Sequence, residues 1–160
     1  SGKKKVAIVG YTNSGKSTLL NAISKAGIYA DDKLFATLET TSRNVWLGDD
    51  KQVILTDTVG FINKLPHMLV DAFASTLEEA LDANLILHVV DISNPAYREQ
   101  IEVVNQTLKQ IGAENIPEII AYNKCDKIHE EIVLKENEIF ISAKTGKNLE
   151  NLKELIKKYI

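Results

Sequence analysis

The stretch GYTNSGKST, Gly10 to Thr18, follows the short apolar run VAIV and decides how the rest of the chain is interpreted. It contains the pattern Gly10-x-x-x-x-Gly15-Lys16-Ser17, in which glycines let backbone N–H groups turn inward around phosphates. In this pattern the lysine reaches the β- and γ-phosphates and the hydroxyl ligates Mg²⁺. A strand before it and a helical stretch after it, with its positive end toward the anion, are the expected context. The motif predicts a nucleoside triphosphate but not its base. The loop residues expected to bind it are Gly10, Tyr11, Thr12, Asn13, Ser14, Gly15, Lys16, Ser17 and Thr18.

The composition fits a single globular domain. Of 160 residues, 44% are hydrophobic and 26% are charged, which is ordinary for a soluble protein. A formal net charge of −3 argues against unspecific nucleic-acid binding through a basic surface. The single cysteine, Cys125, cannot form an intramolecular disulfide, and no apolar run approaches the ~18 residues of a membrane span. We therefore expect a cytoplasmic monomer with one domain over residues 4–160, and a tag remnant or disordered tail over residues 1–3.

Short apolar runs alternate with amphipathic helical stretches, which is the pattern of an α/β domain with a mainly parallel sheet. Gly48-Asp49-Asp50-Lys51 is too short for a crossover helix, so segment 43–56 is predicted to form an antiparallel hairpin. The fold class is thus a three-layer α/β domain with a mainly parallel six-stranded sheet, one antiparallel strand and helices on both faces. A shortened or irregular helix is expected in 127–137. The expected strands are 6–9, 43–47, 53–56, 85–90, 119–122 and 139–141, and the helical stretches are 17–25, 70–81, 97–111 and 149–159.

A second motif, Asn123-Lys124-Cys125-Asp126, follows an apolar strand and so lies where open α/β sheets bind ligands. A carboxylate in the ring plane accepts two hydrogen bonds from the N1–H and exocyclic amine of guanine, a donor pair that adenine lacks. Asp126 is therefore predicted to select guanine, because the wrong base leaves polar groups unpaired. A backbone N–H of the motif after the last strand could bind the guanine carbonyl; that motif is Ser142, Ala143 and Lys144.

Metal and γ-phosphate contacts are expected from Asp57-Thr58-Val59-Gly60, which ends another strand. Asp57 would hold Mg²⁺ through a water, and the Gly60 N–H would meet the γ-phosphate. The polar stretch Gly27–Ser42 is a long connection without clear periodicity, and such connections are usually functional. It holds three threonines that could cap Mg²⁺: Thr37, Thr40 and Thr41.

Together these residues resemble the translation-factor-related GTPases, and most closely the GTP-binding (G) domain of the HflX family in the Obg–HflX group. The resemblance rests on GYTNSGKSTL, LFATLETT, DTVGFINKLPH with the following VDAFASTLEEA, and LHVVD, and it extends from about Lys4 to the C-terminus. It implies a P-loop GTPase with a Ras-like G domain, which binds GTP or GDP with Mg²⁺. Phe35–Glu39 and Asp57–Pro66 would be its two switch segments. Phe35 and Thr37 thereby join the expected nucleotide-binding residues, with Thr37 as the switch threonine.

The resemblance also implies a partner. HflX proteins bind the large ribosomal subunit, and members of the family separate stalled or idle ribosomes. They carry a family-specific domain ahead of the G domain, whereas Lys4 here begins the first strand directly. We therefore expect the chain to be a G domain excised from a longer protein, whose ribosomal role depends on the rest of that protein.

Hydrolysis is expected to be slow, because Phe61 stands where Ras-like enzymes carry the glutamine that positions water. Lys16, Thr37 and Gly60 would remain as catalytic residues. Two sources could supply the missing element: a K⁺ ion bound at Asn13, where a group of GTPases uses asparagine, or the ribosome acting in trans. A nucleotide-binding module with negligible activity of its own is the alternative. An ATPase or small-molecule kinase would not explain the guanine motif.

Four other features have simpler explanations. His88, inside the strand LILHVV, is expected to be a buried, satisfied histidine. Cys125 is interpreted as structural, and Asp91 as a local cap at the start of the following helix. The lysines of the last helix, Lys153, Lys157 and Lys158, are expected on its solvated face.

Overall fold

The computed structural model describes residues 3–24, 41–57, 81–127 and 132–160. Within these residues it forms one six-stranded sheet in the order β2-β3-β1-β4-β5-β6. The strands are β1 Lys4–Gly10, β2 Thr41–Gly48, β3 Lys51–Asp57, β4 Leu85–Asp91, β5 Glu118–Asn123 and β6 Glu138–Phe140. The helices are α1 Lys16–Ser24, α3 Tyr97–Gln110 and α4 Leu149–Tyr159, with a single 3₁₀ turn, η1, at Cys125–Lys127.

The predicted mixture of parallel and antiparallel pairing is confirmed. β1 pairs in parallel with β3 and with β4, and the parallel ladder continues through β5 to β6. Only β2 and β3 are antiparallel among the described strands. Gly48 pairs with Lys51, so Asp49 and Asp50 form the two-residue turn. Their φ values of 54° and 60° are of the positive kind that a type I′ hairpin turn requires.

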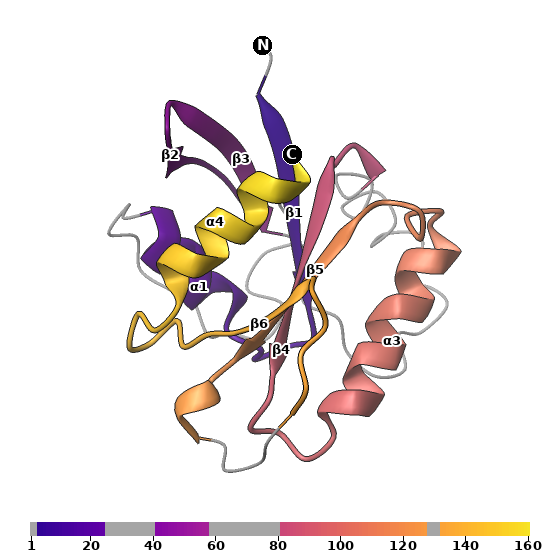
Figure 1. Ribbon diagram of the computed structural model, residues 1–160. Helices are drawn as coiled ribbons and strands as arrows, with labels where there is room; N and C mark the ends of the chain where they lie inside the picture. Colours follow the sequence, from indigo (N-terminus) through magenta and orange to yellow (C-terminus); the bar gives the residue numbers. More distant parts are fainter. Residues whose placement is uncertain (1–2, 25–40, 58–80, 128–131) are drawn as a thin grey trace.

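Helices cover both faces of the sheet, as Figure 1 shows, with α1 and α4 on one face and α3 on the other. The larger core lies on the α1 and α4 face, where Leu19 and Ile156 are among the fully or almost fully buried side chains packed on the strands. On the opposite face Val104 and Leu108 of α3 pack on Val9 and Ile86. Strands covered on both faces are apolar at consecutive positions, which explains the run VAIV in β1 and the apolar residues on either side of His88 in β4.

Local side-chain chemistry sets the ends of α3. The Asn94 side-chain oxygen accepts a hydrogen bond from the Ala96 N–H at 2.9 Å, directly before the helix. Gly112 follows its end with a φ of +85°, and the Ala113 N–H donates back to the Leu108 carbonyl at 2.8 Å. This is the geometry with which a glycine terminates a helix. The predicted helical stretch 97–111 is therefore confirmed to within one residue, since α3 spans Tyr97–Gln110.

The lysines of α4 differ from expectation. Lys153 is buried, with 8% of its surface exposed, and its ammonium reaches Glu150 at 3.5 Å. Lys157 lies 2.9 Å from Asp49 in the hairpin turn and 2.9 Å from Glu154. The prediction of a solvated face therefore holds for Lys158, which is exposed, and was wrong for Lys153 and in part for Lys157, which is half-buried. Long lysines can bury their aliphatic stems while their charged heads stay paired.

Two predicted helical regions lie wholly or partly outside the described residues. The stretch 70–81 is described only at Leu81. In the segment 127–137, Lys127 ends η1, residues 128–131 are not described, and residues 132–137 contain no helix.

Candidate nucleotide-binding site

The sheet brings the predicted motifs together at one edge. Because β1, β3, β4 and β5 are parallel, their last residues, Gly10, Asp57, Asp91 and Asn123, lie at the same edge. A cavity of about 520 Å³ opens there. Its lining comes from the loops after β1, β5 and β6, together with the first turn of α1 and the last residue of β5. The lining residues are Asn13, Gly15, Thr18, Asn123, Lys124, Asp126, Lys127, Ala143 and Lys144.

The loop between β1 and α1 needs both of its glycines. Gly15 has a φ of +96°, and a Cβ atom there would collide with the side-chain amide of Asn123. A Cβ on Gly10 would lie 2.6 Å from both Ser14 Oγ and the Val89 carbonyl. Asn13 also has a positive φ, 66°, and its carbonyl accepts a hydrogen bond from Lys124. The tight turn therefore depends on residues that lack or tolerate a side chain in this conformation.

Asn123 joins the loop after β1 to the loop after β6. Its Nδ2 donates to the Ser14 carbonyl at 2.9 Å, and its Oδ1 accepts from the Ala143 N–H at 3.0 Å. The residue is 2% exposed, so both halves of its amide are used inside the protein. Asn123 therefore holds two walls of the cavity together, and the Ala143 N–H is already engaged.

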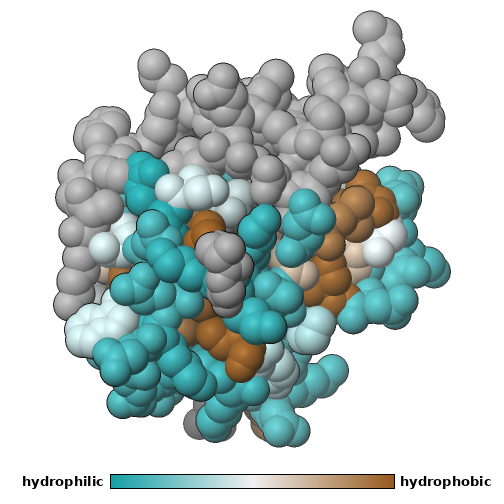
Figure 2. Space-filling view, turned by 90° about the horizontal axis from the view of Figure 1, so that it is seen from above, coloured by the Kyte–Doolittle hydropathy of each residue, from teal (hydrophilic) through white to brown (hydrophobic). Residues whose placement is uncertain are grey.

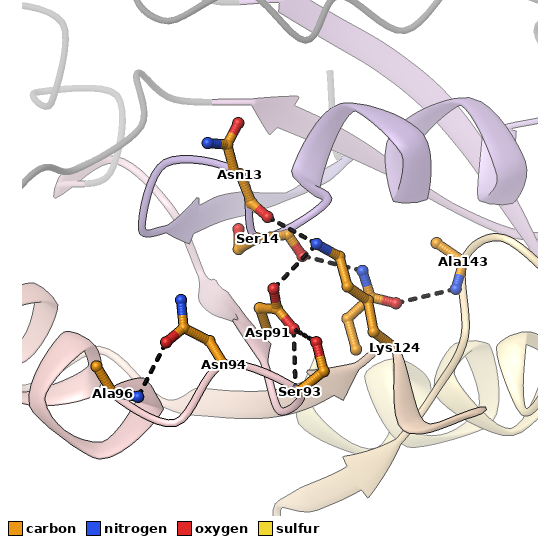
Figure 3. Close-up of polar contacts among 9 residues, drawn as sticks. Asn13, Ser14, Asp91, Ser93, Asn94, Ala96, Lys124 and Ala143 are labelled. Atoms are coloured by element: carbon orange, nitrogen blue, oxygen red, sulfur yellow. Dashed lines mark hydrogen bonds and ion pairs between the residues drawn. The ribbon is translucent and has the colours of Figure 1, made fainter. Parts of the chain in front are cut away.

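Lys124 makes the next link, which Figure 3 shows. Its ammonium donates to the Asn13 carbonyl at 3.0 Å and pairs with Asp91 Oδ2 at 3.0 Å. Asp91 Oδ1 in turn accepts from the Ser93 N–H and from the Ser93 hydroxyl. Asp91 therefore closes the turn that follows β4, and the prediction that it caps the following helix was wrong, because α3 begins at Tyr97 and has no side-chain cap. Sequence reasoning also missed its ion pair with Lys124. The available signal was that Asp91 and Lys124 each stand at the end of an apolar strand, where the carboxyl ends of parallel strands meet.

Asp126 is free to bind a ligand. Its side chain is exposed on the cavity wall and makes no hydrogen bond or ion pair with the other described residues. Lys127, which the sequence did not single out, lines the same wall. Ser142 does not: it is fully buried, and its Oγ accepts from the Thr145 N–H at 3.2 Å. Among the residues of its motif, Ser142 shapes the loop while Ala143 and Lys144 face the cavity.

Lys16, Ser17 and Asp57 meet beside the phosphate loop. Lys16 Nζ lies 3.5 Å from Asp57 Oδ1, and the Ser17 hydroxyl donates to Asp57 Oδ2 at 3.4 Å. Oδ1 is buried and makes no hydrogen bond within the described residues. Burial raises the pKa of the Asp57 carboxyl, and the charge of Lys16 opposes this only in part. An incompletely compensated buried carboxylate next to a hydroxyl is a donor set that suits Mg²⁺.

The described residues contain no group of three or more His, Cys, Asp or Glu that could hold a metal alone. Mg²⁺ is usually held by one or two protein oxygens together with nucleotide phosphates and water. The pair Ser17 and Asp57 therefore fits a metal that arrives with a nucleotide. The other residues predicted for this corner, Phe35, Thr37, Thr40 and Gly60, lie outside the described residues, as does Phe61.

Two side chains predicted to be structural are so placed. His88 is 1% exposed, and its Nδ1 lies 3.0 Å from Glu118 Oε1, so it is buried and satisfied. Burial is also the main cause that raises the pKa of the Cys125 thiol, which disfavours the reactive thiolate.

A phosphate-type loop between the first strand and the first helix, joined to a second loop that carries a free carboxylate, defines a P-loop GTPase domain. The comparisons with known proteins agree. The chain belongs to the 50S ribosome-binding GTPase family, whose model matches residues 5–124. None of the helices in the described residues is long and apolar enough to cross a membrane.

The resemblance to HflX is confirmed by individual relatives. GTPase HflX of Caldanaerobacter subterraneus subsp. tengcongensis is 54% identical over 155 residues, which are 96% of this chain and 36% of that protein. GTPase HflX of Escherichia coli strain K12 is 45% identical over 154 residues, 92% of this chain and 36% of that protein. The chain thus spans about a third of the length of these relatives.

A solved structure gives the same fold. The GTP-binding protein from Sulfolobus solfataricus, in complex with GDP, superposes with a TM-score of 0.79 at 28% identity. The match covers 98% of this chain and 52% of that one. The predicted three-layer G domain fold is therefore confirmed.

Proposed function

We propose that this domain is a GTP-dependent switch that binds GTP, hydrolyses it slowly and thereby changes its affinity for a partner. The observation that carries this proposal is the free carboxylate of Asp126 on a cavity wall that the phosphate loop completes. Asp126 accepts from the N1–H and amine of guanine. With the Ala143 N–H engaged by Asn123, the N–H of Lys144 is our candidate donor to the guanine carbonyl.

The phosphate end of the nucleotide would lie against the loop of residues 10–18. Lys16, which is 3.5 Å from Asp57, turns to the β- and γ-phosphates, where its charge is stabilising. Mg²⁺ supplies charge neutralisation on the phosphates when bound, and Ser17 directly, with Asp57 through a water, would hold it. Thr37 and Gly60 would complete this shell in the GTP state and release on hydrolysis, which is how G domains switch.

Slow turnover follows from the identity of residue 61. Phenylalanine cannot orient a water by hydrogen bonding, so the domain lacks the usual side chain for that task. K⁺ at Asn13 is one substitute, and it is supported by the exposed side chain of Asn13, whose backbone carbonyl rather than amide contacts Lys124. A nucleotide-binding module with negligible activity of its own is the second candidate function, and Phe61 is the feature that favours it.

The partner would be the large ribosomal subunit, met in the cytoplasm, and in the complete protein the switch would promote ribosome dissociation. This is supported by the family's description as ribosome-binding and by the HflX relatives. A net charge of −3 means that such a contact depends on a local patch rather than on the overall field.

Base selection is tested by Asp126→Asn. The amide replaces one acceptor by a donor, so guanine loses a hydrogen bond while xanthine, with a carbonyl at that position, gains one. We expect GTP affinity to fall by roughly 100-fold and xanthosine triphosphate affinity to rise, since buried polar mismatches discriminate strongly. Fluorescent-nucleotide titrations measure both. Unchanged preference for GTP would refute the base assignment.

Turnover is tested by one four-way comparison: GTP hydrolysis in K⁺ or Na⁺, with or without purified large ribosomal subunits. Faster turnover in K⁺ without subunits supports the cation at Asn13, and Asn13→Ala should abolish that difference. Stimulation by subunits in either salt supports the ribosomal element. Negligible turnover under all four conditions would leave the nucleotide-binding module as the function.

A further inference from the structure

Asp91 lies outside the motifs that define the site, yet it contacts them. It is the last residue of β4 and pairs in register with Asn123 of β5. Its side chain is 15% exposed, and Lys124 Nζ lies 3.0 Å from its Oδ2. Its other oxygen accepts from the Ser93 N–H at 3.0 Å and from the Ser93 hydroxyl at 2.5 Å. Because the backbone N–H of Ser93 holds one oxygen of the carboxylate, the second oxygen is directed toward Lys124.

Lys124 needs such an anchor. Its backbone has a φ of 66°, a conformation that residues with a side chain seldom adopt. Its stem is long and flexible, so holding its ammonium in one place has a large entropic cost. The ammonium bridges two loops, because it also donates to the Asn13 carbonyl at 3.0 Å. Asn13 has a φ of 66° as well. The Lys124 ammonium therefore links two residues whose backbones are both in the left-handed region.

The other lysines of the cavity are not held in this way. Lys127 and Lys144 line the same cavity, and neither forms an ion pair with another described residue. Only Lys124 among the three is tied to a carboxylate and to the phosphate loop. Its partner Asp91 does not itself line the cavity, so its contact with the site runs through Lys124.

We propose that Asp91 is a positioning residue of the nucleotide site, which acts by holding Lys124 against the Asn13 carbonyl and so presets the phosphate loop. The inference rests on the proposed function, because it concerns the same nucleotide cavity. Pre-organisation of a loop removes an ordering cost from binding and slows dissociation. Loss of the Asp91 charge therefore loosens the loop through Lys124, without removing any group that touches the nucleotide.

Asp91→Asn isolates this effect. Asparagine keeps an oxygen for the Ser93 turn but gives Lys124 no charged partner, and charge-assisted hydrogen bonds are about twice as strong as neutral ones. We expect the dissociation rate of fluorescent GDP, measured by stopped flow, to rise about 10-fold, as the loss of a partly buried charged contact implies. Ser93→Ala, which removes only the hydroxyl contact on the other oxygen, is the matched control and should change the rate less than ~2-fold.

A double-mutant cycle separates positioning from general destabilisation. In a Lys124→Ala background, Asp91→Asn should have almost no further effect on GDP dissociation, because its route of action is gone. An equal rise in both backgrounds, or Ser93→Ala matching Asp91→Asn, would overturn the proposal. Glu118→Gln, which removes the carboxylate charge that faces His88 at 3.0 Å at the far end of β5, should leave dissociation unchanged. If the unmodified chain fails to bind GDP saturably, the proposed function itself is wrong.

Discussion

Two aspartate–lysine pairs of nearly equal length lie in different regions of this domain. Asp91 and Lys124, 3.0 Å apart, join the end of β4 to a loop of the nucleotide cavity, and their side chains are 15% and 31% exposed. Asp49 and Lys157, 2.9 Å apart, join the hairpin turn to α4, and Asp49 is 84% exposed. The chemistry is the same in both pairs. The difference lies in burial and in what each pair holds.

The contact between Asp49 and Lys157 shifts the pKa values of both groups but contributes little to the stability of the fold. The hydrogen bond and charge of Lys157 hold the pKa of Asp49 below its ordinary value. The hydrogen bonds that Lys157 donates to Glu154 and to Asp49 raise the pKa of Lys157. A lowered carboxyl pKa means that the pair stabilises the fold above the ordinary aspartate pKa, and that this contribution is lost as pH falls through the lowered value. Exposed pairs of this kind are weak and are screened by salt.

The surroundings of the two regions differ as well. The far end of the sheet, with the chain termini in Figure 1, is seen from above in Figure 2, where its described surface is mostly hydrophilic with small apolar patches. Among the described residues, the large apolar side chains exposed anywhere are Trp46, Leu81 and Val133. At the cavity, by contrast, buried polar groups such as Asn123 are fully committed. Polar contacts therefore have structural consequences mainly where water is excluded.

The largest effect is expected from Gly15→Ala. The new methyl group would collide with the Asn123 amide, and the backbone φ of +96° is unfavourable for alanine. We expect at least ~100-fold weaker GDP binding by isothermal titration, because the loop can no longer close on phosphate.

The matched control is Gly112→Ala. Gly112 has a φ of +85° but nothing within 4 Å of an added Cβ, so it carries the backbone strain without the collision. It should lower thermal stability and leave GDP affinity intact. Equal losses of affinity in both variants would show that strain, rather than the cavity geometry, governs binding.

Asp57→Asn should have a smaller effect, of opposite sign for stability and for binding. Because burial raises the pKa of Asp57, the folded state binds more protons than the unfolded state between the ordinary and the raised pKa. Stability of the nucleotide-free chain therefore falls as pH rises through that window. The variant lacks this penalty, so its melting temperature at pH 7 should exceed that of the parent.

The same variant should lose the Mg²⁺ dependence of nucleotide binding, by about 10-fold in affinity at saturating Mg²⁺. Thermal scans from pH 4 to pH 8 check the first effect, since the advantage of the variant should shrink toward acid pH. A lower melting temperature at pH 7 would contradict our assignment of an uncompensated carboxylate.

The smallest effect is expected from Asp49→Asn, which keeps a residue tolerant of the positive φ but removes the charge facing Lys157. Thermal stability should fall slightly at low salt and not at all at high salt. Asp50→Asn, in the same turn but without an ion pair to α4, is its control. A change in GDP affinity in Asp49→Asn would break the comparison, because it would couple the hairpin to the cavity.

Much of the site could be predicted from local patterns. The spacing of its residues identified the phosphate loop, and the place of Asp126 after a strand identified the base motif. Residues of the loop and Asp126 line one cavity. The contacts that hold the cavity in shape could not be predicted in this way. The side chain of Ser142, a residue of the predicted base motif, is buried, whereas Lys127, which was not predicted, lines the cavity wall. The direction of a side chain in a loop depends on neighbouring loops.

By itself, the sequence determined the strands, the hairpin, the helix ends and the identity of the phosphate and base motifs, because these depend on apolar runs and on residues within a few positions of one another. Only the tertiary structure decided the aspartate partners of Lys124 and Lys157, which lie 33 and 108 positions away along the chain. Such pairs form because parallel strands bring their carboxyl ends to one edge and α4 packs beside the hairpin. No local pattern specifies which distant charge will then be within 3 Å.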